Sequence, residues 1–275
     1  MNILVCMKQV PNTQEISIDP ETNTLIREGV ESIVNLYDGY ALEAAARLKD
    51  KDKEIKIYVL SMGPPQAETA LRECLSLSAD IAYLASDRLF AGSDTLATSL
   101  ILSQSIKRIE ALEDIRFDMI FCGKQAIDGD TAQVGPQIAE ILDLPQVTYG
   151  YTCEIKGDEL HVLKETEEGK ELIALKFPCL ATFTKPSFEP RMVSAKRRFA
   201  AKKMEIGRIT ADDLEGIDRT KIGLKGSPTR VRKTYVPQAR KSGTIFRGEE
   251  QEVSARELAG LLVENGIVVN MEAGG

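Results

Sequence analysis

The chain has 275 residues, 43% of them hydrophobic and 28% charged, and 35 basic against 42 acidic residues give a formal net charge of −7. This length suits one large α/β domain, or one domain with a docking arm. The acidic balance disfavours general binding to nucleic acid or to anionic membranes. No apolar run approaches the roughly 20 residues of a membrane span. The N-terminus MNILVCMKQVPN lacks the features of a signal or transit peptide, so we expect a cytoplasmic protein.

The cysteine and histidine content disfavours metal centres and histidine-based catalysis. No two of the five cysteines lie at metal-ligand spacing, so we expect no metal site. The single histidine, His161, argues against a Ser-His-Asp hydrolase.

The first half of the chain alternates short apolar runs with helical patterns. Buried strands are expected at residues 3–7, 55–61, 81–85 and 119–122, because each run is short, apolar and bounded by polar or turn residues. Helices are expected at 40–49, 66–77, 95–109 and 131–142, with Ser93 or Asp94 capping the third. This alternation predicts a parallel sheet with helices on both faces, an α/β Rossmann-like fold.

The middle of the chain is typical of β-structure. Residues 152–155 and 160–163 flank Lys156-Gly157-Asp158-Glu159, which predicts a hairpin, and 172–177 and 180–183 add strand character. We expect this part to extend the sheet with antiparallel edge strands.

The C-terminal part changes in composition. Residues 191–203 (RMVSAKRRFAAKK) carry six basic residues, and 211–251 are polar with scattered Gly and Pro, as in an extended arm. A capping box at residues 254–257 predicts a terminal helix that ends at Asn265-Gly266. We therefore expect an α/β domain over residues 1–205 and an arm with a helix over 206–275, docking on its own domain or on another chain.

The loop after the fourth strand, Gly123 to Pro136 (GKQAIDGDTAQVGP), is the strongest candidate site. It follows the carboxyl end of a parallel strand and enters a helix, where free backbone N–H groups suit a phosphate. Its glycines allow close backbone approach to a ligand. Neither G-x-x-x-x-G-K-[ST] nor G-x-G-x-x-G is present, and a plain turn with Asp130 or Thr131 as N-cap explains the loop equally well. Loops 6–8, 61–65 and 91–95 are expected near the same sheet edge, and residues 35–38, which precede the first helix, could cap that helix or close over a ligand.

Taken together, these segments resemble the electron transfer flavoprotein β (small) subunit. The matching stretches are VCMKQVP, NLYDGYALEAAARLK, VLSMGPPQAETALRECL, GSDTLATS, CGKQAIDGDTAQVGPQIAE, FPCLATFTKP, EPRMVSAKRRFAAKK and LKGSPTRV, in that order over nearly the whole chain. The resemblance implies an adenine-nucleotide α-hydrolase-like domain with a C-terminal arm that docks on the α subunit.

The resemblance also implies a cofactor site without a catalytic side chain. In ordinary members this site holds AMP, and in electron-bifurcating members it holds FAD. The implied cofactor-binding residues are Cys6, Asn35, Leu36, Tyr37, Asp38, Met62, Thr95, Thr98, Gly123, Lys124, Gln125, Ala126, Ile127, Asp128, Gly129, Asp130, Thr131, Ala132, Gln133 and Val134.

The DGDTAQVGP form of the loop, with GSDTLATS upstream, is similar to that of the bifurcating group. The resemblance then implies that FAD accepts hydride from NADH, with one electron passing through the α-subunit FAD to a partner dehydrogenase and the other to ferredoxin or flavodoxin. The basic stretch 191–203 is similar to the family's dehydrogenase-docking loop, although Ala195 stands where AMP-type members carry a leucine, and Met192 or Phe199 could replace it. A solvated basic face is the plainer interpretation of this stretch.

Two other functions stay open at this point. One is a non-bifurcating subunit that holds structural AMP in the same site. The other is a stand-alone nucleotide-binding protein or hydrolase of the same fold, since fold alone does not decide function.

Overall fold

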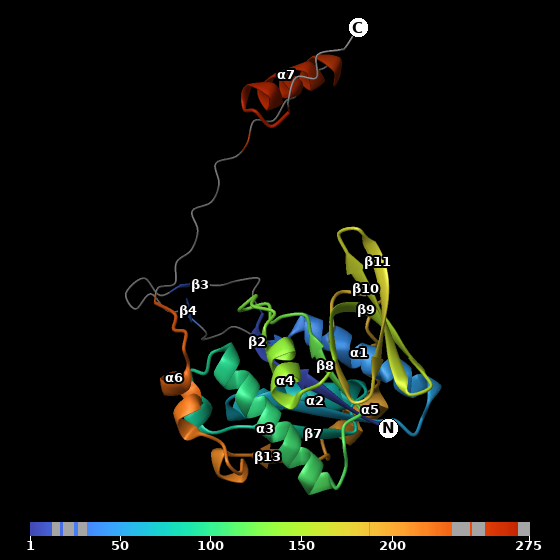
Figure 1. Cartoon of the computed structure of the whole chain (residues 1–275), viewed down its shortest axis with the longest axis vertical. Coiled ribbons are helices and arrows are strands. Elements are labelled where there is room, and N and C mark those ends of the chain that lie inside the picture. Colours follow the sequence, from blue (N-terminus) through green and yellow to red (C-terminus); the bar gives the residue numbers. More distant parts are fainter. Residues whose placement is uncertain are drawn as a thin grey trace. The chain divides into compact units, whose positions relative to one another are not determined.

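The computed structural model describes residues 1–12, 17–18, 25–26, 32–186, 188–232, 243 and 251–268. The chain divides into two compact units, Met1–Thr234 and Tyr235–Gly275. The first unit contains the large sheet and the helices beside it (Figure 1). All residues that line the pocket described below belong to this unit.

A nine-stranded sheet forms the centre of the first unit, in the order β11-β10-β9-β12-β8-β1-β6-β7-β13. Its strands are β1 (Asn2–Met7), β6 (Lys56–Met62), β7 (Ile81–Ala85), β8 (Met119–Gly123), β9 (Gln146–Lys156), β10 (Glu159–Thr166), β11 (Gly169–Lys176), β12 (Cys179–Phe183) and β13 (Ile206–Ile209). The first four strands expected from the sequence are all present, within one or two residues of their expected bounds.

Strand direction divides the sheet into a parallel body and an antiparallel edge. β9, β12, β8, β1, β6, β7 and β13 pair in parallel, and only the β9–β10 and β10–β11 pairs are antiparallel. The predicted hairpin and antiparallel edge are therefore confirmed. β12 differs from the expectation, because it lies inside the sheet between β9 and β8. All five of its residues are buried, as expected of a strand covered on both faces.

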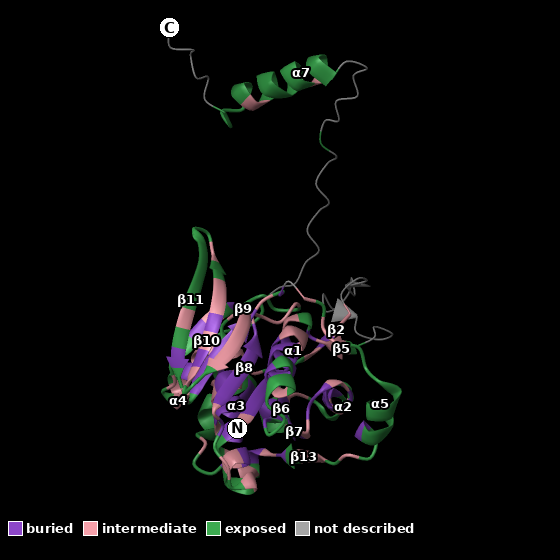
Figure 2. Ribbon diagram, turned by 90° about the vertical axis from the view of Figure 1, so that its right-hand side faces the viewer, coloured by how far each residue is buried: buried purple, intermediate pink, exposed green. Residues whose placement is uncertain are grey.

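Helices cover both faces of the parallel body, which confirms the predicted fold class. The helices are α1 (Leu36–Lys51), α2 (Glu68–Leu77), α3 (Thr95–Glu113), α4 (Val134–Leu142), α5 (Ala195–Ala201) and α6 (Gly223–Gly226). Alternate β1 residues face opposite layers: Ile3 and Val5 pack with α1 and α2, whereas Leu4 and Cys6 pack with α3 and α4. Figure 2 shows this buried centre between exposed helix surfaces.

Short elements complete the unit. β2 (Gln9–Pro11) pairs with β5 (Ser32–Val34), and β3 (Ser17–Ile18) pairs with β4 (Leu25–Ile26). Single 3₁₀ turns occupy η1 (Pro65–Ala67), η2 (Arg88–Phe90), η3 (Ala211–Asp213) and η4 (Arg219–Lys221). None of the described helices is long and apolar enough to cross a membrane.

The segment after residue 205 packs on the α/β unit before any arm begins. β13 pairs with β7 and forms the edge of the sheet, and Ile209, Leu214 and Ile222 are buried in the core beside α3. The expected boundary at 205/206 therefore falls just before a strand of the sheet. Sequence periodicity missed this segment because its apolar anchors are widely spaced. Residues 233–242, 244–250 and 269–275 of the expected arm lie outside the described residues.

The second unit contains α7 (Gln251–Glu264). It starts three residues before the predicted capping box and is followed by Gly266 with a φ of +66°. Its apolar residues are exposed in this chain: Val253, Leu258, Leu261 and Val263. Docking of this helix on another subunit stays a prediction.

Candidate functional site

A pocket of about 350 Å³ opens at the carboxyl ends of β1 and β8. From β1 the chain moves through β6 to β7 on one side, and β8 then lies on the other side of β1. The boundary between β1 and β8 is thus the topological switch point, where open α/β sheets bind ligands. Cys6, Met7 and Lys8 come from the end of β1, and Cys122 and Gly123 from the end of β8.

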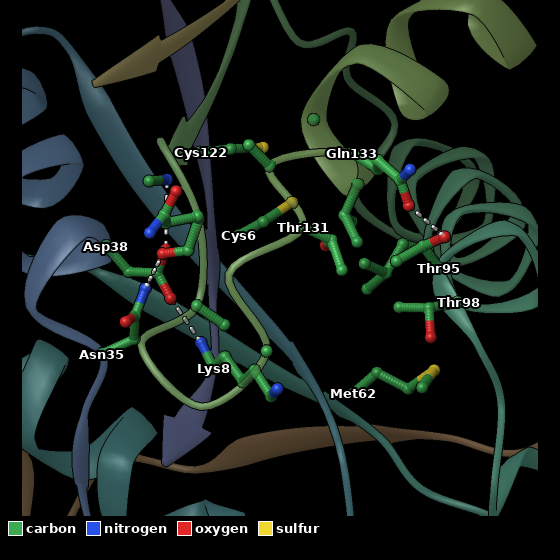
Figure 3. Close-up of a pocket in the computed structure, with 18 of the residues that line it drawn as sticks. Cys6, Lys8, Asn35, Asp38, Met62, Thr95, Thr98, Cys122, Thr131 and Gln133 are labelled. Carbon is green, nitrogen blue, oxygen red and sulfur yellow. Dashed lines mark hydrogen bonds between the residues drawn. The ribbon is translucent and has the colours of Figure 1, made fainter. Parts of the chain in front are cut away.

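The start of α1 holds the ends of these two strands together. Asp38, in the first turn of α1, accepts the backbone N–H of Lys8 (2.8 Å) and that of Gly123 (3.1 Å). Asn35 does not cap α1 with its side chain. Its side-chain amide instead donates to the Gln125 carbonyl (2.8 Å) and accepts the Ile127 N–H (3.1 Å). Asn35 and Asp38 therefore fix the first half of the candidate loop (Figure 3).

The Asp38 carboxyl group has a raised pKa. Burial raises this pKa from 3.8 to about 7, against the opposing effect of the hydrogen bonds from Lys8, Asn35 and Gly123. A buried carboxylate that accepts two backbone N–H groups is costly to leave unpaired. The hydrogen bonds of Asp38 to Lys8 and Gly123 therefore stabilise the structure of the pocket.

The second half of the loop has an unusual backbone. Asp130 and Ala132 both adopt left-handed conformations, with φ of +52° and +54°. For an alanine this costs roughly 1–2 kcal/mol, and such strain concentrates at functional sites. α4 consequently begins at Val134 and not at Thr131 as expected, and its N-cap is Gln133, which makes no side-chain capping bond. The alternative of Asp130 or Thr131 as a simple N-cap is therefore wrong.

The two loop aspartates are paired and do not line the pocket. Asp128 accepts a hydrogen bond from the Lys8 ammonium (2.6 Å), and Asp130 accepts one from the Gln125 amide (2.6 Å). Lys8 compensates the charge of Asp128, and Asp130 lies outside the pocket lining, which weakens the electrostatic objection to an anionic ligand at this loop. Lys124 lines the pocket, and among the described residues it has no carboxylate partner.

The loop glycines serve different purposes. A Cβ on Gly123 would lie 2.3 Å from Asp38 Oδ1, and a Cβ on Gly135 would lie 2.6 Å from Thr182 Cγ2. These two glycines are required by packing within the protein, which corrects the expectation that they admit a ligand. A Cβ on Gly129 would meet no heavy atom within 4 Å. Gly129 also lines the pocket, and it alone of the three has open space at its Cβ position.

The start of α3 forms the opposite wall of the pocket. Asp94 caps α3 by accepting the Ala97 N–H (3.1 Å), which confirms one of the two predicted caps. The Thr95 hydroxyl donates to the Gln133 side-chain oxygen (2.9 Å), so the first turns of α3 and α4 are joined (Figure 3). Two helix N-termini thus meet at one cavity. The Asp94 carboxylate caps that of α3, so the partial positive charge of α4 is the one left without a side-chain cap.

Part of the pocket lining is apolar and uncharged. It includes Met62, Leu102, Cys6 and Cys122. A side-chain hydrogen bond with Cys6, together with burial, raises the pKa of the Cys122 thiol well above its usual range. Neutral sulfur and methyl groups of this kind suit the face of a flat ring.

Most of the residues expected from the sequence come together here, and five do not. The sequence-predicted residues that line the pocket are Cys6, Asn35, Asp38, Met62, Thr95, Thr98, Gly123, Lys124, Gln125, Ala126, Gly129, Thr131, Ala132, Gln133 and Val134. Leu36, Tyr37, Ile127, Asp128 and Asp130 belong to the same loops but are absent from the lining, and Leu36 is 54% exposed. Whether the lining residues bind a cofactor stays a prediction.

Further lining residues were outside the predicted set: Met7, Lys8, Ser93, Asp94, Leu102, Cys122 and Gly135. Met7, Lys8, Ser93 and Asp94 lie in loops 6–8 and 91–95, which were expected near this sheet edge, and Cys122 lies one residue before the end of β8. Among the described residues no group of three His, Cys, Asp or Glu side chains could hold a metal ion.

The lining fits an adenine nucleotide. The α4 N-terminus has no side-chain cap and Lys124 has no carboxylate partner, so N–H groups and one ammonium remain for a phosphate. The apolar lining residues suit a flat ring, and the pocket volume lies within the usual range of small-molecule sites. Fold and pocket together define a doubly wound α/β protein with its cavity at the switch point.

Comparison with known proteins gives the family. Residues 22–214 match the electron transfer flavoprotein domain. The electron transfer flavoprotein subunit beta of Thermoanaerobacterium thermosaccharolyticum is 54% identical over 253 residues, 92% of this chain and 94% of that protein. The protein of the same description from Megasphaera elsdenii is 50% identical over 256 residues, 93% and 94%. The caffeyl-CoA reductase-Etf complex subunit CarD of Acetobacterium woodii is 44% identical over 263 residues, 96% and 97%.

The chain therefore belongs to the electron transfer flavoprotein family, as a β subunit.

Proposed function

We propose that this β subunit pairs with an α subunit, binds FAD in the pocket between β1 and β8, and takes part in electron bifurcation. The observation that carries the proposal is the convergence of the α3 and α4 N-termini and the strained loop 123–133 on one cavity at the switch point. When bound, FAD would accept hydride from NADH and release the two electrons singly. One would pass to the α-subunit FAD and a dehydrogenase, and the other to ferredoxin or flavodoxin.

The chain's own residues bind and orient the cofactor. The first-turn N–H groups of α4 and the Lys124 ammonium bind phosphate, while Thr131 offers a hydroxyl from the loop. Cys6, Cys122 and Met62 provide the apolar surface for a ring. None of these residues needs to transfer a proton, which agrees with the single histidine of the chain.

AMP in the same pocket is the alternative ligand, because AMP shares the adenosine and one phosphate with FAD. Support for FAD comes from the DGDTAQVGP loop and from Thr95 and Thr98, which both line the pocket wall. The relative from Acetobacterium woodii is named as a subunit of a caffeyl-CoA reductase complex. This name supports the proposal that the present chain transfers electrons to or from a dehydrogenase or reductase partner.

A dehydrogenase-docking surface is proposed at residues 191–203. Met192 is 94% and Phe199 is 70% exposed, so two large apolar side chains lie on the surface within a basic stretch. Lys196, Arg198, Lys202 and Lys203 form no ion pair among the described residues. These four charges are available for electrostatic steering of an acidic partner.

Two basic residues of this stretch hold it in place instead. Arg191 pairs with the buried Glu43 (2.8 Å) and with Asp50 (2.7 Å) on α1. Arg197 donates to the carbonyls of Ala79 (3.0 Å) and Leu75 (3.4 Å) at the end of α2. The docking surface is therefore expected to be presented by a fixed α5.

Anaerobic titration of the purified αβ complex with NADH tests the proposal. Reduction of flavin by NADH at close to two equivalents per heterodimer supports two flavins, one of them in the β-subunit pocket. Uptake of one equivalent or less supports AMP in this pocket and a non-bifurcating subunit.

A further inference from the structure

The N-cap of α3 is completed by a residue from a distant part of the chain. In a capping box, the N-cap side chain accepts the N–H of the third helical residue, whose own side chain accepts the N-cap N–H. Asp94 makes the first of these bonds, to Ala97 (3.1 Å). Ala97 has no side-chain acceptor for the second. The Asp94 N–H instead donates to Ser227 Oγ (2.8 Å), 133 residues further along the chain.

A second residue of the same segment binds the Asp94 carboxylate. Thr229 donates to Asp94 Oδ2 through its backbone N–H (2.9 Å) and its hydroxyl (2.8 Å). Burial alone would raise the pKa of Asp94, but the hydrogen bonds from Ala97 and Thr229 hold this pKa below its usual range. Asp94 is among the residues that line the pocket, and these donors fix the position of its carboxylate.

The segment is shaped to fit against the loop that precedes α3. Gly223 has a φ of +64°, and a Cβ there would lie 2.2 Å from the Leu89 carbonyl oxygen. The Leu224 N–H donates to the Ala91 carbonyl (3.0 Å), and the buried Ser227 hydroxyl donates to the Gly223 carbonyl (2.8 Å). Residues 223–229 therefore form a clamp, built from α6 and the three residues after it, on the start of α3.

We propose that Ser227 and Thr229 are positioning residues of the nucleotide site, acting through Asp94. They fix the first turn of α3, which carries Thr95 and Thr98 in the pocket wall, and Thr95 in turn holds Gln133 at the start of α4. Both helix N-termini of the site thus depend on this clamp. The inference rests on the proposed function, because it assigns residues outside the pocket to nucleotide binding.

Reciprocity follows from this arrangement. If the clamp strengthens nucleotide binding, nucleotide must strengthen attachment of the clamp by the same factor. The clamp ends at Thr229, and Arg230, Val231 and Arg232 follow it as exposed residues leading to the second unit. Ligand in the pocket is therefore expected to protect residues 223–229 from hydrogen exchange.

The test compares Ser227→Ala and Thr229→Val with Thr229→Ser, which keeps the hydroxyl, and with the control Thr220→Val. Thr220 lies in η4, where its hydroxyl donates only to Asp218. Each full-length chain, purified with the α subunit and freed of pocket ligand, is titrated calorimetrically with AMP and ADP. Ser227→Ala and Thr229→Val should each raise Kd about tenfold, equivalent to ~1.4 kcal/mol. Thr229→Ser and Thr220→Val should stay close to wild type.

Hydrogen exchange of the ligand-free proteins provides a readout that does not need nucleotide. Ser227→Ala and Thr229→Val should speed exchange at the first turn of α3 and leave the β1 amides unchanged. Wild-type nucleotide affinity in both variants, with binding intact in the parent, would overturn the inference and leave the proposed function standing. A parent protein that binds neither AMP, ADP nor FAD would overturn the proposed function, and this inference with it.

Discussion

Gly129→Val tests the candidate site most selectively, because the structure predicts opposite effects on folding and on binding. A Cβ at residue 129 meets no heavy atom within 4 Å, and the backbone there is outside the left-handed region. The free energy of unfolding should therefore change by less than about 0.5 kcal/mol, as at ordinary surface positions. The two valine methyl groups would nevertheless enter the space beside the loop where ligand is proposed to lie.

The effect on binding can be scaled from packing. Extra methyl groups in a well-filled space cost typically ~1–3 kcal/mol, so nucleotide affinity should fall about 5- to 150-fold. The assay is calorimetric titration with ADP, with thermal unfolding of the ligand-free protein measured in parallel. Gly39→Val is the matched control, since Gly39 also has open space at its Cβ but lies on α1 outside the pocket lining. Unchanged ADP affinity in Gly129→Val would refute the role of the loop.

Four other variants separate packing, charge and docking. Gly123→Ala should lower the unfolding temperature by several degrees, because its Cβ would lie 2.3 Å from Asp38 Oδ1. Asp38 has a folded-state pKa of about 7 against 3.8 when unfolded, so its stabilising contribution is lost as pH rises toward 7. This effect should lower the free energy of unfolding of the wild type by about 2 kcal/mol between pH 5 and 7, and Asp38→Asn should abolish this part of the decrease. The double variant Lys196→Ala, Arg198→Ala should slow dehydrogenase association about tenfold and reduce its salt dependence, whereas Arg197→Ala should loosen α5 without changing that salt dependence.

Each of these predictions has a simple readout. Thermal unfolding with a normal midpoint in Gly123→Ala would show that α1 can move away from β8. The free energy of unfolding is measured by denaturant titration at several pH values from 5 to 7. If it changes equally with pH in wild type and in Asp38→Asn, the assigned pKa is contradicted. If stopped-flow association is unchanged in the double lysine–arginine variant, the basic stretch is only a solvated face.

The parallel body of the sheet could be predicted because each strand is a short apolar run with clear boundaries. The interior position of β12 could not, since its place depends on pairing with β8 and β9, which are distant in sequence. β13 was missed for a similar reason. Its four residues form an edge strand only through pairing with β7, which is distant in sequence.

The candidate site was predicted in outline because ligands of α/β sheets lie where strands end. The start of α4 was misplaced because nothing in the sequence indicates that Asp130 and Ala132 adopt left-handed conformations. The roles of Gly123 and Gly135 were also misassigned, since close helix–strand packing and close ligand approach both require glycine. The clamp at 223–229 was expected in the arm, and only the contacts of Ser227 and Thr229 place it beside α3.

The small-molecule content of the purified αβ heterodimer tests the central claim most directly. Cofactors are released by denaturation, separated by chromatography and counted per heterodimer. The proposed function predicts two FAD and no AMP, with the second FAD lost in Gly129→Val. One FAD and one AMP would contradict it, and would make this chain a structural scaffold with AMP in the pocket between β1 and β8.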